Sequence, residues 1–529
     1  MALSLASFQS CFKRTERNLQ IFSLLMGLLT ILFFYLAFPS GGVPELAWFT
    51  LVPVLFVLNK LSLRNAFMLG LLAATLGWFV SIWWVIAGLA EITSSSANIM
   101  LPFVLLFCLL SALPYAVACW THVRFKFGHS ISGAFFSAIV FTVLVNYIPH
   151  ILPGNLAHAL YQQPIFIQLA DIGGVALVFF IIHVINILIA NGINFSTSNT
   201  TKATQCFGLA CLLFLANMAY GSYKQHALLN YVDAPTKTIK IAMLQPNIDV
   251  SNRSRIDWKN AQATISQLLT QVNKEQGIDL IIFPEVPVPI SFQHYQNDGL
   301  FFNRFLAETP LLLTAISPFD ESTTQDVSYF NTMELIESNA VQQEYAKQVL
   351  LPFGEYLPYE QQFPWLRKVF PFAPNYKPGN TSTLFTLNNA QGESIQAIPL
   401  ICYEAVFSEQ IAAGVAQGGE LMINTSNDAW FFQTAGRKVH LALSLFRSVE
   451  YRQYLVRATN TGLSAVINPY GQIVEGSEIT ADTQGYSVVD IPIEKHSSFY
   501  QMFPNFIKII FILICFVFLI YARVKNVNR

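Results

Sequence analysis

Residues 398–406 read IPLICYEAV, an apolar run of strand length that ends in a cysteine, a tyrosine and a glutamate. In α/β proteins, ligands bind where strands end, so Cys402 occupies a favourable position for a nucleophile. The other cysteines lie in or beside apolar spans, and Cys402 stands alone in the water-compatible part of the chain. It therefore has no partner for a disulfide within its own domain. This stretch predicts a layered domain of strands and helices with Cys402 as the candidate nucleophile.

Alternating strand and helix patterns continue on both sides of this stretch. Amphipathic helices, with apolar residues three and four positions apart, are predicted over residues 258–276 and 437–453. Short runs rich in branched and aromatic residues predict strands over residues 238–244, 279–284, 311–317, 398–402, 420–424, 463–468 and 486–491. Strands that alternate with helices in this way indicate a layered α/β or α+β domain.

Composition separates this globular domain from a membrane module. Of the 529 residues, 53% are hydrophobic and 12% are charged, which is too apolar for a wholly soluble protein. The excess of apolar residues lies before residue 225 and after residue 503. We therefore expect a membrane module of seven transmembrane helices over residues 1–235, a catalytic domain over residues 236–498, and an eighth transmembrane helix with a cytoplasmic tail over residues 499–529.

Eight apolar runs are long enough to cross about 30 Å of hydrocarbon. They cover residues 18–38, 43–59, 66–90, 99–121, 130–149, 165–190, 205–223 and 503–522. The second run contains Pro44 and Pro53, which predicts a kinked or partly re-entrant segment. Lysine and arginine residues occupy alternate short loops, so both termini are expected in the cytoplasm and the globular domain on the opposite side of the membrane. The polar groups inside the spans are interpreted as scarce and uncharged, which argues against a transporter.

Net charge and residue spacing exclude several other classes of function. A formal charge of −1 provides no extended basic face, so nucleic acid is not an expected partner. The nine histidines show no spacing suited to zinc, and the sequence contains no glycine-rich phosphate loop. We therefore expect neither a metal site nor a cofactor.

Charged residues upstream of Cys402 complete a candidate catalytic group. Glu285 follows the strand-like run IIFP and can accept the thiol proton as a general base. Lys347 supplies a positive charge that lowers the pKa of the thiol and stabilises the oxyanion formed by attack on a carbonyl. Glu355 follows across a Pro-Phe-Gly turn and can orient the ammonium group. The backbone N–H of Tyr403 is a second candidate donor to the oxyanion.

The motifs around these residues resemble the nitrilase superfamily of carbon–nitrogen hydrolases and, within it, the apolipoprotein N-acyltransferase family. The matching runs are FPE at Glu285, Y-x-K-x-x-L-x-P-F-G-E-Y-x-P from Tyr345 to Pro358, CYE at Cys402, N-x-S-N-D-A-W-F from Asn424, and R-A-T-N-T-G-x-S-A from Arg457. The resemblance covers nearly the whole chain. It implies a multi-span α-helical membrane module with an inserted nitrilase-like αββα sandwich.

The resemblance also implies roles for the site residues. The catalytic triad is then Glu285, Lys347 and Cys402, and the supporting residues are Glu355, Tyr403 and Glu404. The implied reaction is N-acylation of the S-diacylglyceryl cysteine at the N-terminus of an apolipoprotein, with a phospholipid acyl chain carried as a thioester on Cys402. The implied partners are that phospholipid, the apolipoprotein and membrane lipids. The protein is expected to be a monomer in the bacterial cytoplasmic (inner) membrane, with its catalytic domain on the periplasmic side.

Two other functions are compatible with the residues alone. A membrane-tethered amidase or nitrilase would use the same triad to hydrolyse a small soluble substrate, although eight spans exceed what a tether requires. Release of ammonia or a free acid, in place of an N-acylated peptide, would identify it. A catalytically inactive scaffold or lipid-binding protein would not need the triad, and the intact triad weighs against it.

Several further residues are assigned by position. Trp430 and Trp258 are candidate gates for an acyl chain, although both also fit ordinary interfacial aromatics. The third span contains Gly77, Trp78 and Trp84, which we interpret either as the lining of a lipid path or as anchors at the membrane interface. We interpret five further residues as members of a buried polar network that supports the site: Asn427, Asp428, Arg447, Glu450 and Arg457. Departures from the usual family pattern fall in loops, at Pro246, Val286 and Phe432.

Overall fold

The chain forms two compact units. The computed structural model describes residues 16–92, 96–148, 151–230, 237–248, 258–285, 309–318, 329–338, 340–370, 373–381, 383–431, 434–493 and 496–527. The first unit comprises Met1–Trp83, Pro102–Asn230 and Met502–Arg529, and the second comprises Trp84–Leu101 and Tyr231–Gln501. The segment Trp84–Leu101 thus belongs with the strand-rich unit, which the hydropathy of the sequence did not predict.

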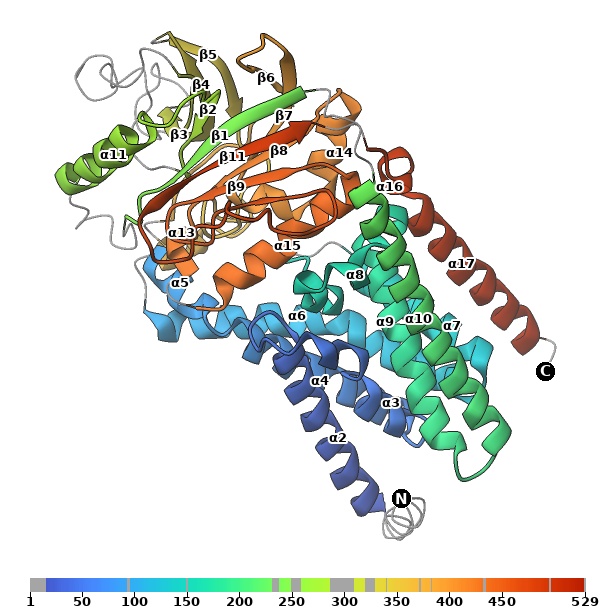
Figure 1. Ribbon diagram of the computed structural model, residues 1–529. Coiled ribbons are helices and arrows are strands. Elements are labelled where there is room, and N and C mark those ends of the chain that lie inside the picture. Colours follow the sequence, from blue (N-terminus) through green and yellow to red (C-terminus); the bar gives the residue numbers. More distant parts are fainter. Residues whose placement is uncertain are drawn as a thin grey trace. The chain divides into compact units, whose positions relative to one another are not determined.

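The first unit is helical (Figure 1). Its elements are α2 (Glu16–Ala37), η1 (Pro44–Trp48), α3 (Val52–Leu58), α4 (Leu63–Ile82), α6 (Ala97–Arg124, from Pro102), η2 (Phe127–His129), α7 (Ile131–Asn146), η3 (Leu156–Gln162), α8 (Pro164–Ile167), α9 (Ala170–Phe195), α10 (Thr200–Asn230) and α17 (Phe506–Val527). Among the described residues, six helices are long and apolar enough to span a membrane. Two shorter apolar segments, Pro44–Leu58 and Ile131–Asn146, account for the other predicted spans, so the count of eight is approximate.

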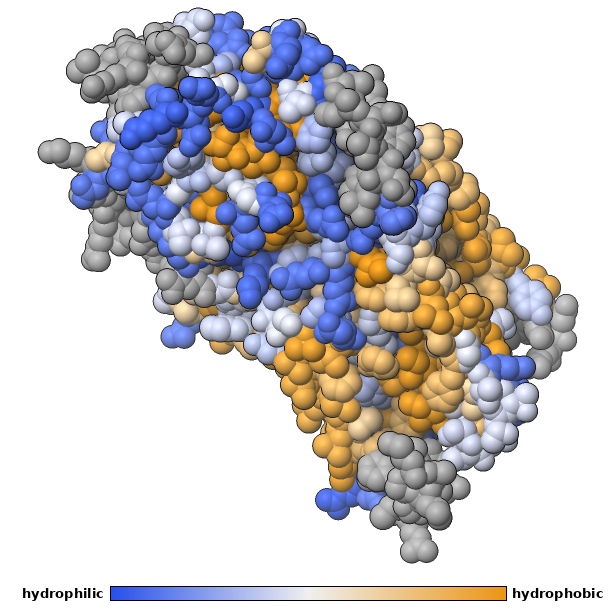
Figure 2. Space-filling view, viewed as in Figure 1, coloured by the Kyte–Doolittle hydropathy of each residue, from blue (hydrophilic) through white to orange (hydrophobic). Residues whose placement is uncertain are grey.

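The surface of these helices is strongly apolar, and Figure 2 shows hydrophobic residues gathered over them. Large exposed hydrophobic side chains include Ile21, Leu24, Leu25, Leu28 and Leu32 on α2 and Ile509, Ile512, Leu513, Phe516 and Val517 on α17. Such extended exposed apolar surface is stable only in lipid or against a partner. The protein is therefore a membrane protein.

The second predicted span is interrupted, as its two prolines indicated. It consists of η1 and α3, and the break between them leaves backbone groups without intrahelical partners. Asn186 of α9 satisfies two of them, since its Oδ1 accepts from Leu51 N at 2.9 Å and its Nδ2 donates to Ala47 O at 3.1 Å. The hydroxyl of Thr30 accepts from Val54 N at 3.1 Å. Broken helices are tolerated in membranes when neighbouring helices supply these bonds.

The interpretation of the spans as uncharged was wrong at Asp171. This residue lies at the start of α9, within the predicted span 165–190, and is 1% exposed. Its carboxylate accepts a hydrogen bond from the hydroxyl of Tyr220 at 2.7 Å and pairs with the ammonium of Lys224 at 2.9 Å. Both partners belong to α10. The buried carboxylate therefore has partners within the helix bundle and joins α9 to α10.

The second unit contains two β-sheets. One has the order β11-β1-β2-β3-β4-β5 and the other the order β10-β9-β8-β7-β6. The strands are β1 (Lys237–Gln245), β2 (Leu280–Ile282), β3 (Leu311–Pro318), β4 (Tyr329–Glu337), β5 (Ala340–Ala346), β6 (Phe385–Asn388), β7 (Ser394–Ile401), β8 (Leu421–Ser426), β9 (Leu455–Thr459), β10 (Ala465–Ile467) and β11 (Gly485–Ile493). The helical elements are α5 (Val85–Ile92), α11 (Trp258–Val272), α13 (Trp365–Val369), η5 (Cys402–Val406), α14 (Ser408–Ala416), η6 (Asp428–Phe431), α15 (Gly436–Tyr451) and α16 (Phe499–Met502).

Alternate side chains of both sheets meet in one hydrophobic core. Ile241 and Leu312 of the first sheet share this core with Ile401 and Val456 of the second. The opposite face of the first sheet packs against α11. The second sheet is covered by α14 and α15, which contact β7 and β9. These layers confirm the expected αββα sandwich. Strands β4, β5, β6 and β9 were not predicted, because their polar and charged residues interrupt the apolar alternation.

Candidate active site

Cys402 lies at a sharp turn where β7 ends and η5 begins. Its backbone φ of 51° falls in the left-handed region, which costs a non-glycine residue about 1–2 kcal/mol. Glu404 stabilises the turn, because its Oε2 accepts a hydrogen bond from the backbone N–H of Ile401 at 2.7 Å. The strand-end position expected for the cysteine is therefore formed, with its side chain partly buried.

Glu404 also joins this turn to the segment that carries Lys347. Its Oε1 accepts hydrogen bonds from the backbone N–H groups of Gln348 at 2.7 Å and Val349 at 3.1 Å, and from the hydroxyl of Tyr345 at 2.8 Å. Burial raises the pKa of the Glu404 carboxyl, and these donors act against the rise. With donors on both oxygens, Glu404 fixes the distance between two segments that are far apart in the sequence.

Lys347, Glu285 and Glu355 form a buried ionic cluster. The ammonium of Lys347 lies 2.8 Å from Glu355 Oε1 and 3.7 Å from Glu285 Oε1. Lys347 is 1% exposed and Glu285 is 6% exposed, so water screens these charges little. Asn331 of β4 lies between the two carboxylates and donates from Nδ2 to Glu285 Oε1 at 2.8 Å and to Glu355 Oε1 at 3.2 Å. One ammonium and one amide thus hold two like charges together.

Backbone groups fix the second oxygen of each carboxylate. Glu285 Oε2 accepts from the N–H of Asn427 at 2.9 Å, and Glu355 Oε2 accepts from the N–H of Leu351 at 2.7 Å. Asn427 follows β8, in the sheet that carries Cys402, whereas Glu285 follows β2 in the other sheet. The cluster therefore lies where the ends of the two sheets meet.

The electrostatics of the cluster favour proton transfer between Cys402 and Glu285. Burial raises the pKa of the Glu285 carboxyl, and the charge of Lys347 offsets only part of this rise. A hydrogen bond with the Cys402 side chain also acts on that carboxyl, so the thiol and the carboxyl face each other. Burial and the charge of Glu285 raise the pKa of the Cys402 thiol, although Lys347 acts to lower it. The resting cysteine is therefore a thiol, and its activation requires a base.

Lys347 keeps its charge in this buried position. Burial alone would lower the pKa of its ammonium, but the charges of Glu355 and Glu285 reverse this effect and raise the pKa above its usual value. A permanently charged donor beside the thiol can stabilise negative charge that develops on a carbonyl oxygen.

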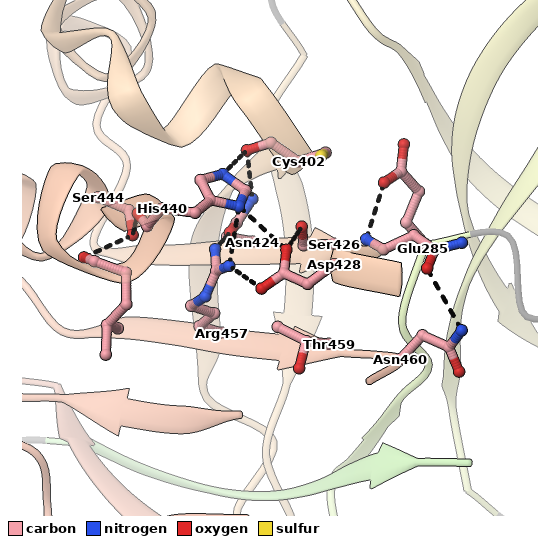
Figure 3. A network of polar contacts seen from close by, with 12 residues as sticks. Glu285, Cys402, Asn424, Ser426, Asp428, His440, Ser444, Arg457, Thr459 and Asn460 are labelled. Atoms are coloured by element: carbon pink, nitrogen blue, oxygen red, sulfur yellow. Dashed lines mark hydrogen bonds and ion pairs between the residues drawn. The ribbon is translucent and has the colours of Figure 1, made fainter. Parts of the chain in front are cut away.

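A second buried polar network adjoins Cys402 (Figure 3). Arg457 of β9 donates to Asn424 Oδ1 at 2.7 Å and to Asp428 Oδ2 at 2.8 Å. The Nδ1 atom of His440 lies 3.0 Å from both Asp428 Oδ1 and an Arg457 nitrogen. Burial opposes ionisation of Asp428, but Arg457 and His440 hold the pKa of its carboxyl well below its usual range.

The other expected members of the supporting network are also buried. Arg447 pairs with Glu450 at 3.0 Å and donates to the backbone oxygen of Val406 at 3.3 Å. Val406 is the last residue of η5, so this pair contacts the far end of the segment that begins at Cys402. Tyr403 packs its ring edge-on against Phe407, with centroids 4.7 Å apart.

Trp84 lies outside the helix that forms the third predicted span. That span ends with α4 at Ile82, and Trp84 belongs to the strand-rich unit, where its ring packs edge-on against Phe431 at 5.3 Å. Gly77 and Trp78 do lie on α4. The backbones of Trp430 and Trp258 lie in η6 and at the start of α11, but their side chains are outside the described residues. Pro246 is buried just after β1, and Val286 and Phe432 are outside the described residues.

Sequence reasoning missed Asn331 and His440. Asn331 lies in β4. The signal in the sequence was a polar residue beside a short run of alternating apolar residues. His440 lies within the predicted helix 437–453, as the single histidine among its apolar positions. Neither residue lies in a recognisable catalytic motif, because the residues that each one contacts are distant in the sequence.

The model of the carbon–nitrogen hydrolase family matches residues 240–501, so the strand-rich unit that carries the buried Cys-Lys-Glu cluster belongs to that class. The model of the apolipoprotein N-acyltransferase N-terminal domain matches residues 31–188. The chain belongs to the apolipoprotein N-acyltransferase family, since these two matches cover both of its modules in the order of that family.

Two relatives of known name agree with this assignment. The apolipoprotein N-acyltransferase of Geobacter metallireducens is 26% identical over 464 residues, which cover 85% of this chain and 86% of the relative. That of Bdellovibrio bacteriovorus is 28% identical over 406 residues, which cover 73% of each chain. A solved structure of an amidase from Nesterenkonia sp. covers 48% of this chain and 91% of its own, with 21% identity and a TM-score of 0.35.

The position of Asn331 leads to a stability prediction. Asn331→Asp places a third carboxylate against Glu285 and Glu355, and we expect it to lower the free energy of unfolding by about 1–3 kcal/mol at neutral pH. Buried, crowded carboxyls have raised pKa values in the folded state, so folding takes up protons and stability rises as the pH falls. The deficit should therefore shrink between pH 8 and pH 5 in thermal unfolding measurements. Asn468→Asp, in a turn, is the control. A deficit that does not change with pH would contradict this interpretation of the cluster.

Proposed function

We propose that this protein transfers a fatty-acyl chain from a membrane phospholipid to the N-terminal amine of an S-diacylglyceryl apolipoprotein. The observation that carries the proposal is the joining of two parts in one chain. One is a membrane module that matches the N-terminal domain of apolipoprotein N-acyltransferases, and the other is a hydrolase domain with a buried Cys-Lys-Glu cluster. A membrane module gives the site access to substrates that are themselves lipids.

In the first half-reaction, Glu285 removes the proton of Cys402 and the thiolate attacks the ester carbonyl of the phospholipid. The ammonium of Lys347 stabilises the resulting oxyanion, together with the backbone N–H of Tyr403. The carbon–oxygen bond then breaks, and Glu285 returns its proton to the leaving oxygen. The products are a lysophospholipid and a thioester on Cys402.

In the second half-reaction, the amine of the diacylglyceryl cysteine attacks the thioester carbonyl. Glu285 takes a proton from the attacking nitrogen, an amide bond forms, and the carbon–sulfur bond breaks. The proton held by Glu285 then returns to the thiolate of Cys402. Throughout both steps Glu355 holds the ammonium of Lys347 by the contact of 2.8 Å, and Glu404 holds the turn.

The location follows from the charge pattern of the loops. Basic residues concentrate in alternate short loops, which supports cytoplasmic termini and a catalytic domain on the periplasmic side of the inner membrane. In this arrangement residues 236–498 form the catalytic domain, and residues 1–235 and 499–529 anchor that domain in the membrane. One chain supplies all members of the cluster, so a monomer suffices. Reporter fusions at residue 390 and at the C-terminus, read for periplasmic activity, would test the orientation.

Mass spectrometry of the purified protein tests the chemistry. After incubation with phospholipid vesicles, the expected result is a mass increase of one acyl chain on the peptide that contains Cys402. Addition of a diacylglyceryl lipopeptide should then remove this adduct and yield an N-acylated peptide. Release of free fatty acid at the same rate with and without the lipopeptide would instead identify a hydrolase. Cells that lack the protein should accumulate lipoproteins with a free N-terminal amine.

A further inference from the structure

The backbone carbonyl of Cys402 faces away from the reacting side of the residue. Figure 3 shows its oxygen directed at His440 and Asn424, while its sulfur lies on the side of Glu285. Because Cys402 has a φ of 51°, its conformation is strained and must be held by surrounding contacts. The hydrogen bonds to this carbonyl are therefore part of what fixes the direction of the thiol.

Two side chains from different elements bind that oxygen. Asn424 of β8 donates from Nδ2, and Nε2 of His440 on α15 lies within hydrogen-bond distance, each at 3.3 Å. A carbonyl oxygen can only accept, so Nε2 of His440 carries the hydrogen. Both residues are buried, so bulk water competes little for this carbonyl.

A single guanidinium orients both donors. Arg457 donates to Asn424 Oδ1 at 2.7 Å, which turns the amide nitrogen of Asn424 toward Cys402. It also lies 3.0 Å from Nδ1 of His440, an atom that is equally 3.0 Å from Asp428 Oδ1. Arginine only donates and a carboxylate only accepts, so Nδ1 either accepts from Arg457 or donates to Asp428. Burial and the charge of Arg457 lower the pKa of His440, although Asp428 acts to raise it. Asp428 balances the charge of Arg457.

The imidazole is also held from the loop that follows Asp428. The ring of Phe431 packs edge-on against His440 with centroids 5.7 Å apart, and the ring of Trp84 packs edge-on against Phe431 with centroids 5.3 Å apart. The ring is therefore held by polar contacts at both nitrogens and by an aromatic contact at one side.

We propose that His440 is a positioning residue: with Asn424 it clamps the Cys402 carbonyl and so directs the thiol at Glu285 and the substrate carbonyl. The expected effect on acyl transfer rests on the proposed function. The orientation of the thiol by His440 does not depend on it. A displaced nucleophile reacts more slowly, and misplacement by about 1 Å can cost on the order of 100-fold in rate.

Two polar substitutions of His440 distinguish the role of Nε2 from the role of Nδ1. His440→Gln reaches as far as Nε2 and keeps a donor for the carbonyl, whereas His440→Asn matches only the Nδ1 side and leaves the carbonyl without that donor. The full-length protein in detergent is treated with iodoacetamide, and alkylation of Cys402 is followed by peptide mass spectrometry. Acyl-enzyme formation from phospholipid is measured in a single turnover. Ser444→Ala, a buried neighbour on the same helix, is the control.

We expect His440→Asn to slow both alkylation and acylation by about 10- to 100-fold, with KM for phospholipid unchanged. His440→Gln and Ser444→Ala should stay within about threefold of the natural protein. Equal rates for the glutamine and asparagine variants, whether both fast or both slow, would overturn the proposal, as would a variant that is slow only through a raised KM. If alkylation follows the expected order while no variant forms a thioester, the acyl-transfer function fails and the positioning role stands.

Discussion

Lys347→Met is expected to reduce acyl-enzyme formation by about 1000-fold and also to destabilise the fold by about 3–5 kcal/mol. The ammonium is 1% exposed and is shared by Glu285 at 3.7 Å and Glu355 at 2.8 Å. Its removal leaves two buried carboxylates without a counter-ion and takes away the charge that faces the thiol. Single-turnover kinetics and thermal unfolding measure the two losses separately.

The pH dependence and a second substitution distinguish these effects. Without Lys347 the pKa of Glu285, already raised by burial, rises further, so the folded state binds a proton more tightly than the unfolded chain. The stability deficit should therefore shrink as the pH falls. Lys347→Met combined with Glu355→Gln removes one of the unpaired charges, and we expect it to recover stability but not activity. Lys377→Met, on an exposed lysine, is the control. Recovery of activity in the double variant would show that Lys347 acts only through stability.

Cys402→Ala is expected to abolish acyl-enzyme formation and transfer to a lipopeptide, with a loss of at least about 1000-fold. In the proposed mechanism the thiol is the group to which the acyl chain is covalently bound. Since the substitution removes only a sulfur at a partly buried position, the fold should persist. Intact-mass spectrometry after incubation with phospholipid measures the adduct.

Cys402→Ser gives a finer test of the same site. The hydroxyl has nearly the same geometry but is much harder to deprotonate than a thiol, even with Glu285 as its base. We expect slow acylation and a stable ester in place of a thioester, so the second half-reaction should be impaired more than the first. Cys211→Ser, at an exposed cysteine of α10, is the control and should leave the adduct unchanged. An adduct that persists in Cys402→Ala would refute the assignment of the nucleophile.

The thiol and the carboxyl that we propose as its base are held by different sheets. Cys402 follows β7, while Glu285 follows β2 and receives a hydrogen bond from the backbone N–H of Asn427, 142 residues further along the chain. Strain at Cys402 is balanced by hydrogen bonds on both sides: Glu404 accepts one from the N–H of Ile401, and His440 and Asn424 donate to the carbonyl of Cys402. A nucleophile supported in this way needs little reorganisation at the moment of attack, which is the main source of electrostatic catalysis in buried sites.

What the sequence determined by itself is local. Apolar runs of about 20 residues predicted the membrane helices, and short alternating runs predicted seven strands and the two main helices of the globular domain, because hydrophobic periodicity follows from the geometry of each element. The position of Cys402 at a strand end followed in the same way. The charged runs around Glu285 and Lys347 were recognisable because each lies next to proline or glycine in a short segment.

Only the tertiary structure decided which buried polar groups meet. Asn331 reaches two carboxylates 46 and 24 residues away, and His440 reaches a carbonyl 38 residues away, distances over which no sequence period operates. Asp171 finds its partners on a neighbouring helix, and Trp84 packs in the strand-rich unit despite the apolar run before it. The physical reason is the same in each case. Burial of a polar group is favourable only with a specific partner, and the folded chain, not the local pattern, supplies that partner.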